Sequence, residues 1–135
     1  MAQKENNIIP MIFDEAFYRK MATQKWRQQD YKKAAEYYEK VLELSPKDFD
    51  IQQHYAQCLV KLNIGKKAER LFYENIVKDF HVAESFYELS QLNIELNEPN
   101  KAFLFGINYV ILSEDKDFRE MLEKTFEVTY TNEQK

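Results

Sequence analysis

The amino-acid sequence repeats at an interval of 34 residues. Three alanines stand at this spacing, and each follows a lysine: Ala34, Ala68 and Ala102. A second set of small residues lies twelve positions earlier and keeps the same interval: Ala22, Ala56 and Ser90. Two small positions that recur together at a fixed period indicate a stacked helical repeat, in which each unit buries its apolar face against the next.

Small residues at these positions have a physical role where the two helices of a hairpin cross. A small side chain lets the backbones approach, whereas a bulky replacement of Ala68 would overpack the crossing at a cost of roughly 1–3 kcal/mol. The high helix propensity of alanine does not explain the shared period. The pattern therefore predicts an all-α fold of paired helices.

The composition agrees with long helices and few turns. The 135 residues include two glycines and three prolines, and 44% are apolar, which is ample material for a core. A chain of this length is expected to form one domain. The net charge of −4 argues against nucleic acid as the main partner, because neutralising phosphates requires clustered lysine and arginine.

Cysteine usage and hydropathy bear on the compartment. Cys58 is the single cysteine and cannot form an internal disulfide, which agrees with a reducing cytosol. Its place among apolar residues favours a small core residue over a nucleophile. No apolar run is long enough for a transmembrane helix, and residues 8–13 are too short for a signal-peptide core. We therefore expect a cytoplasmic protein without membrane contact.

Apolar residues at helical spacing predict seven helices. They are expected at residues 14–28, 31–44, 48–62, 66–79, 82–96, 100–112 and 116–128. Asp14 and Asp48 precede two of these helices and are expected to cap their N-termini. Gly65, in the turn before the fourth helix, is suited to a positive φ angle.

The two ends of the chain lie outside the helix pairs. Residues 1–13 are expected to be an extended segment, whose apolar part at 8–13 covers the first helix pair or docks on a partner. The seventh helix is expected to cover the apolar face of the last repeat. A polar tail at 129–135 then reads as the end of the chain. Gly106 is expected to leave room for a side chain of the seventh helix, such as Phe126.

The sequence resembles tetratricopeptide-repeat proteins. The closest stretch is QDYKKAAEYYEKVLELSP, in which Ala34, Tyr38 and Pro46 match the family's alanine, aromatic and closing proline. The second repeat keeps Ala68 and Phe72. Several positions depart from the family pattern: Phe80 and Glu114 in place of the closing proline, Gly106 in place of the second-helix aromatic, and Lys25 and Asn93 in place of the first-helix aromatic.

This resemblance implies a right-handed α-solenoid of three antiparallel helix hairpins with a seventh capping helix. The repeats would span residues 15–48, 49–82 and 83–116 within a repeat domain at 14–128, with the cap at 116–128. The resemblance also implies a concave groove, lined by the first helix of each hairpin, in which a segment of another protein binds.

Helical spacing separates the core of each first helix from the stripe that would face this groove. The first and second repeats contribute ten residues: Arg19, Lys20, Thr23, Trp26, Arg27, Gln53, His54, Gln57, Val60 and Lys61. The third repeat contributes six: Glu84, Tyr87, Glu88, Gln91, Ile94 and Glu95. The stripe grades from basic to acidic and would orient a ligand of opposite gradient. The alternative is an ordinary solvated helix surface, with Trp26 in the core.

One subgroup of the family binds the C-terminal carboxylate of chaperones through a clamp of basic and amide side chains. The matching positions here are Arg19, Thr23, His54, Glu84 and Glu88. Two acidic groups would repel a carboxylate, so we predict that this clamp is absent.

The sequence contains no pattern typical of an enzyme, a metal site or a cofactor site. Glycine is too scarce for a phosphate-binding loop. His54 and His81 have no companion cysteine at zinc spacing. We therefore expect a non-catalytic adaptor or scaffold that binds a protein or peptide. The alternative is a structural protein that self-associates, for example as a homodimer, through the N-terminal apolar segment or the capping helix.

Overall fold

The computed structural model describes the backbone of residues 14–134 and the side chains through residue 125. Every regular element in this range is a helix, as predicted. The helices are α2 (Glu15–Arg27), α3 (Tyr31–Leu44), α4 (Phe49–Lys61), α5 (Gly65–Val77), α6 (Val82–Glu95), α7 (Pro99–Ser113) and α8 (Lys116–Gln134). The predicted segment at 1–13 lies outside the described residues.

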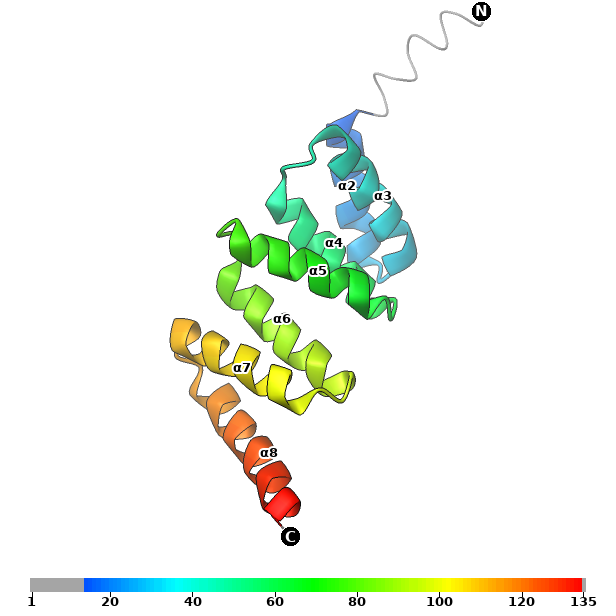
Figure 1. The fold of residues 1–135 in the computed structure, drawn as a ribbon. Coiled ribbons are helices and arrows are strands. Elements are labelled where there is room, and N and C mark those ends of the chain that lie inside the picture. The colour runs from blue at the N-terminus through cyan, green and yellow to red at the C-terminus, as the bar shows by residue number, and fades with distance from the viewer. Residues whose placement is uncertain (1–13, 135) are drawn as a thin grey trace, which may run out of the picture. The chain divides into compact units, whose positions relative to one another are not determined.

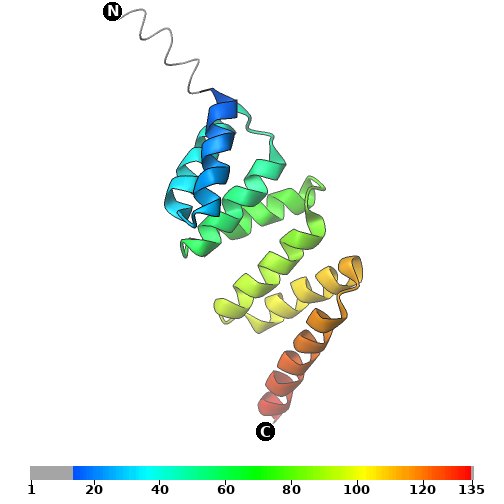
Figure 2. The same cartoon turned by 180° about the vertical axis from the view of Figure 1, so that it is seen from behind.

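The chain divides into two compact units, Met1–Leu71 and Phe72–Lys135, and their boundary falls within α5. In the first unit, α3 contacts both α2 and α4. In the second unit, α7 contacts both α6 and α8. Figures 1 and 2 show the hairpins α2–α3 and α6–α7 from opposite sides. The predicted extent of the repeat domain and its division into repeats stay predictions.

The small residues with the 34-residue period lie in the core of both units. Ala22, Ala34, Ala56, Ala68 and Ser90 have no exposed surface, and Ala102 retains 3%. In the second unit the crossing is visible directly, because the Ser90 hydroxyl donates a hydrogen bond of 2.8 Å to the Ala102 carbonyl. That bond joins α6 to α7 at the position where the period places two small residues together.

Local capping explains where several helices begin. The side chains of Asp14 and Asp48 accept hydrogen bonds from the backbone N–H groups of Phe17 and Ile51, which confirms both predicted N-caps. Asp30 caps α3 in the same way, through the N–H of Lys33. Pro99 stands in the first turn of α7, where its missing N–H costs nothing.

The prediction for Gly65 was wrong, because Gly65 begins α5 without a positive φ angle. The left-handed residue of that turn is Asn63, with φ of 63°. Asparagine tolerates this conformation better than most side chains do.

The turns that close each hairpin repeat one geometry. Gln29, Asn63 and Asn97 are left-handed and stand 34 residues apart. At each turn the N–H of the following residue reaches back to the carbonyl five residues earlier, as in the 2.9 Å bond from Asp30 to Lys25. This pattern is the Schellman motif, which satisfies the last carbonyls of a helix. The period therefore governs the turns as well as the core.

The helix α8 packs on α7 through two buried side chains, Phe118 and Leu122. Asp115 caps α8 at the N–H of Phe118 and accepts a hydrogen bond from the Tyr109 hydroxyl, which ties the start of α8 to α7. The predicted tail at 129–135 was wrong in part, because α8 continues to Gln134. No glycine or proline follows residue 128 to end the helix.

Gly106 provides the space in which α8 packs. A Cβ atom at this position would lie 2.7 Å from one Leu122 methyl carbon, 2.9 Å from the other and 3.0 Å from the Ser90 hydroxyl oxygen. The expectation that Gly106 makes room for a side chain of the last helix is confirmed, with Leu122 as that side chain. The side chain of Phe126 lies outside the described residues.

Replacing Gly106 should therefore have two opposite effects on stability: the added side chain favours the helix, but it also clashes with its neighbours. Gly106→Phe should lower the free energy of unfolding by roughly 1–3 kcal/mol, because the ring has no space beside Leu122 and Ser90. Gly106→Ala combined with Leu122→Ala should be more stable than Leu122→Ala alone by up to about 1 kcal/mol, because the clash with the Leu122 methyl groups is gone, only the 3.0 Å approach to the Ser90 hydroxyl remains, and alanine favours the helix. Urea unfolding of the four proteins measures both differences. Equal stability of Gly106→Phe and the wild type would contradict this account of the packing.

Candidate functional site

Four of the residues predicted for the first-repeat part of the groove line one open depression on α2. They are Arg19, Lys20, Thr23 and Arg27, and they enclose a volume of about 820 Å³ together with Gln24 and Gln28. Lys20, Thr23 and Arg27 are exposed. The successive turns of one helix present these side chains along the same side.

The charge of Arg19 is already engaged by two carboxylates. Its guanidinium pairs with Glu15 at 3.1 Å and with Asp48, which lies at the start of α4. The Ser45 hydroxyl donates a hydrogen bond to Glu15. This network ties α2 to the segment between α3 and α4, so Lys20 and Arg27 supply the positive charge of the depression.

The same network shifts the pKa values of its acidic members. Hydrogen bonds from Ser45 and then from Arg19 hold the pKa of Glu15 below its ordinary value. Partial burial alone would raise the pKa of Asp48, but the hydrogen bonds from Arg19 and from the Ile51 N–H outweigh burial and lower it. Both carboxylates are therefore held in the charged form.

Trp26 lies at the edge of this surface in a cluster of aromatic and cationic groups. Its ring is half-buried and meets Tyr31 edge to face, with ring centroids 5.2 Å apart. The Lys61 ammonium lies over the Tyr31 ring, 5.9 Å from its centroid. Trp26 and Lys61 were both predicted for the groove, and Tyr31, which the sequence analysis did not select, joins them.

The second-repeat residues on α4 differ in exposure. His54 is exposed and stacks on Tyr38 with centroids 6.0 Å apart, while Gln57 and Val60 are half-buried. Gln53 differs from the expectation, because its side chain is 3% exposed and belongs to the core. Spacing alone assigned Gln53 to the stripe, but it shares the buried face of α4 with Ala56.

The third-repeat residues on α6 belong to the second unit. Glu84 is exposed and pairs with His81 at 2.6 Å, and Glu95 is exposed. Tyr87 packs against the rings of Tyr109 and Phe118 at centroid distances of 5.1 and 5.2 Å, and those two rings also contact each other at 5.0 Å. Tyr87 is therefore part of the packing between α6, α7 and α8.

The remaining third-repeat residues are Glu88 and Gln91, which are half-buried, and Ile94, which lines a small cavity of about 160 Å³ beside Phe103 and Leu122. The basic-to-acidic gradient along all three repeats stays a prediction. Within the first unit, Arg19, Lys20 and Arg27 line the same depression.

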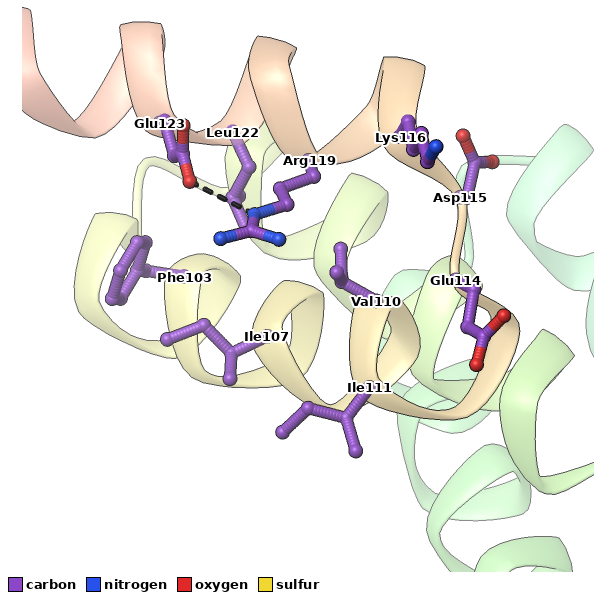
Figure 3. A pocket seen from close by; sticks show the side chains of 10 residues that line it. All are labelled: Phe103, Ile107, Val110, Ile111, Glu114, Asp115, Lys116, Arg119, Leu122 and Glu123. Atoms are coloured by element: carbon purple, nitrogen blue, oxygen red, sulfur yellow. Dashed lines mark hydrogen bonds and ion pairs between the residues drawn. The ribbon is translucent and has the colours of Figure 1, made fainter.

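Sequence reasoning missed a second cavity, which lies between α7 and α8. It encloses about 600 Å³, and its lining is mainly apolar, with Phe103, Ile107, Val110, Ile111 and Leu122 inside a rim of charged residues. Figure 3 shows these side chains together with the ion pair of 3.1 Å between Arg119 and Glu123. The signal that could have found it is the run of apolar residues along α7. Two residues of the cavity lining, Ile107 and Ile111, have glutamates as their counterparts in the first repeat.

The single cysteine, Cys58, lies in the core of the first unit. Cys58 is fully buried, and burial raises the pKa of its thiol to about 12, as expected for a core residue rather than a nucleophile. Among these residues no group of three or more potential metal ligands gathers. None of the described helices has the length and apolar character needed to cross a membrane.

Comparison with known proteins identifies the repeat. Residues 25–72 match the tetratricopeptide repeat family. The crystal structure of the MamA protein matches with a TM-score of 0.73 at 19% identity, over 85% of this chain and 63% of that one. The P58(IPK) TPR domain matches with a TM-score of 0.80 at 18% identity, over 98% of this chain and 37% of that one. No match was found among curated proteins.

The chain spans less than two thirds of the length of either of these structures. Their likeness confirms the predicted all-α helical-repeat solenoid. The match to the tetratricopeptide repeat family itself is confined to residues 25–72.

The Arg19 network should make stability depend on pH. A carboxylate whose pKa is lowered by folding stabilises the protein above its unfolded pKa, and this contribution is lost as pH falls through the folded pKa. Arg19→Met should therefore reduce stability at pH 7, by up to about 1 kcal/mol for the Arg19–Asp48 pair after solvent screening. The difference from the wild type should begin to shrink below the ordinary pKa of these carboxylates, about 4, and should disappear once pH has fallen through their lowered folded pKa values.

Urea unfolding at neutral and at acidic pH measures this difference. Lys20→Met is the matched control, because Lys20 is the exposed neighbour of Arg19 on the same helix. An effect of Arg19→Met that is the same at both pH values would contradict the assignment.

Proposed function

We propose that this chain is a tetratricopeptide-repeat protein and acts as a non-catalytic adaptor, which holds a segment of another protein along the first helices of its repeats. The observation that carries the proposal is the depression on α2, where Lys20, Thr23 and Arg27 gather beside Arg19. An open, positively charged surface next to a half-exposed aromatic ring is suited to an acidic segment with an apolar residue.

The proposed ligand follows from the chemistry of this surface. Lys20 and Arg27 are exposed and would pair with acidic side chains, while Trp26 and Lys61 border Tyr31 and would receive an apolar or aromatic side chain. Arg19 is held by Glu15 and Asp48, so it is poorly placed to clamp a terminal carboxylate. We therefore propose an internal acidic segment as the ligand rather than a chain end.

Selection from a random peptide library on the full chain tests this function. Peptides with amidated C-termini should be enriched in aspartate and glutamate near an apolar residue. Lys20→Glu combined with Arg27→Glu should weaken their binding at least tenfold, because the new charges repel the ligand. Trp26→Ala should cost about 2 kcal/mol of binding free energy if Trp26 is a dominant contact.

The matched control reverses two exposed lysines outside this surface, Lys32 and Lys47. It changes the net charge equally and should leave binding unaltered. Circular dichroism checks that each variant keeps its helices. A library without acidic enrichment, or equal losses in the two double variants, would refute the α2 surface as the binding site.

Self-association through the N-terminal apolar segment or the capping helix remains the alternative function. The apolar stretch at residues 8–13 of the sequence suggests this alternative. Sizing the full chain beside a chain that lacks residues 1–13 separates the two ideas. If that segment joins two copies, the shortened chain should be a monomer and the full chain should not.

A further inference from the structure

The outer face of α7 is apolar and open to solvent. Leu104, Ile111 and Leu112 keep 60%, 70% and 54% of their surface exposed, and Ile107 lies between the first two on the same face. Leu104, Ile107 and Ile111 follow the spacing of successive helical turns, so they form one continuous strip. Figure 3 shows Ile107 and Ile111 at the cavity beside α8.

The repeat itself shows that this strip is unusual. The residues at the same three positions of the first repeat are Glu36, Glu39 and Glu43, and all three are exposed. The second repeat is intermediate, with Arg70, Tyr73 and Val77. A solvent-facing helix of this fold therefore carries charges in one repeat, whereas α7 carries three large apolar side chains in their place. Exposed apolar surface of this kind marks an interaction site.

The charges at the two ends of α7 indicate the partner. The helix has Lys101 in its first turn and Glu114 directly after its last residue, and from Ala102 to Ser113 it has no charged residue. Both charges oppose the helix dipole, which favours acidic groups at the N-terminus and basic groups at the C-terminus. An antiparallel copy of the same helix would bring Glu114 of that copy near Lys101, beside the N-cap Glu98, and would bring a basic group to the C-terminal end.

One register of two antiparallel α7 helices pairs both the apolar and the charged residues. Placing Leu104 opposite Ile111 of a second copy also places Lys101 opposite Glu114 of that copy, because both pairs are centred between Ile107 and Asn108. A two-fold axis at that point forms each pair twice, as a symmetric dimer requires. Lys101 and Glu114 are both exposed and can reach across such an interface.

We propose that the outer face of α7 is a homodimer interface, in which α7 packs antiparallel against α7 of a second copy. The strip of Leu104, Ile107 and Ile111 forms its apolar centre, and reciprocal Lys101–Glu114 ion pairs close its two ends. The interface lies in the second unit and uses no residue of the α2 surface. It is therefore independent of the ligand proposed above.

Sedimentation velocity of the full chain, over concentrations reaching the high micromolar range, tests this interface. The wild type should dimerise. Leu104→Glu combined with Ile111→Glu should leave a monomer, because two like charges per copy would be buried at the centre. Lys101→Glu alone and Glu114→Lys alone should each weaken the dimer about tenfold, since each creates two repulsive pairs. The two reversals together should restore wild-type affinity.

The matched control is Glu36→Lys combined with Glu43→Lys, which alters the equivalent exposed positions of the first repeat and should leave the dimer intact. Because all the substituted residues are exposed, circular dichroism and thermal unfolding should show unchanged folding. The charge-reversal series tests the interface even if the glutamates at 104 and 111 disturb α7.

Three results would overturn the proposal. The first is a wild type that stays monomeric at every concentration, which would leave the strip to a different protein. The second is a dimer that survives the Leu104 and Ile111 substitutions, including one that depends on residues 1–13. The third is a double charge reversal that fails to restore association, which would exclude the antiparallel register.

Discussion

The close crossing of two helices at small residues is the interaction on which the rest of the structure depends. Between α6 and α7 the approach is close enough for the Ser90 hydroxyl to bond directly to the backbone carbonyl of Ala102. A larger side chain at either position would push the helices apart and expose the large residues packed around the crossing. The absence of a side chain at Gly106 extends the same constraint to α8, which places Leu122 in the space.

The turn inside each hairpin adds a second constraint that recurs with the same period. Each first helix ends in a left-handed residue at the same position of the repeat, Gln29, Asn63 or Asn97, although none of these is glycine. A left-handed conformation costs an ordinary side chain roughly 1–2 kcal/mol. The chain accepts this cost because the turn satisfies the helix carbonyls and directs the second helix back onto the first. Gln29 shows that the geometry is imposed by packing rather than by local preference.

The features that sequence reasoning predicted correctly are those encoded by neighbouring residues or by the period. Asp14 and Asp48 could be identified as caps because a cap acts within three residues. The outcome for Gly65 shows the limit, since glycine permits a positive φ angle but does not require it. The end of α8 was misplaced because no residue stops the helix where the apolar pattern fades.

The candidate site was predictable only in part, because its properties depend on contacts between distant residues. Arg19 was assigned to the groove by spacing, yet its charge is engaged by Asp48, which lies 29 residues further along the chain. Tyr31 was overlooked because it begins a second helix, and it meets Trp26 and Lys61 only through folding. Repetition, in turn, restricts the buried positions and leaves the outer ones free. The same outer position can therefore be Glu36 in one hairpin and Leu104 in another while Ala34 and Ala102 remain alike, so function in such a chain lies in the positions where its repeats differ.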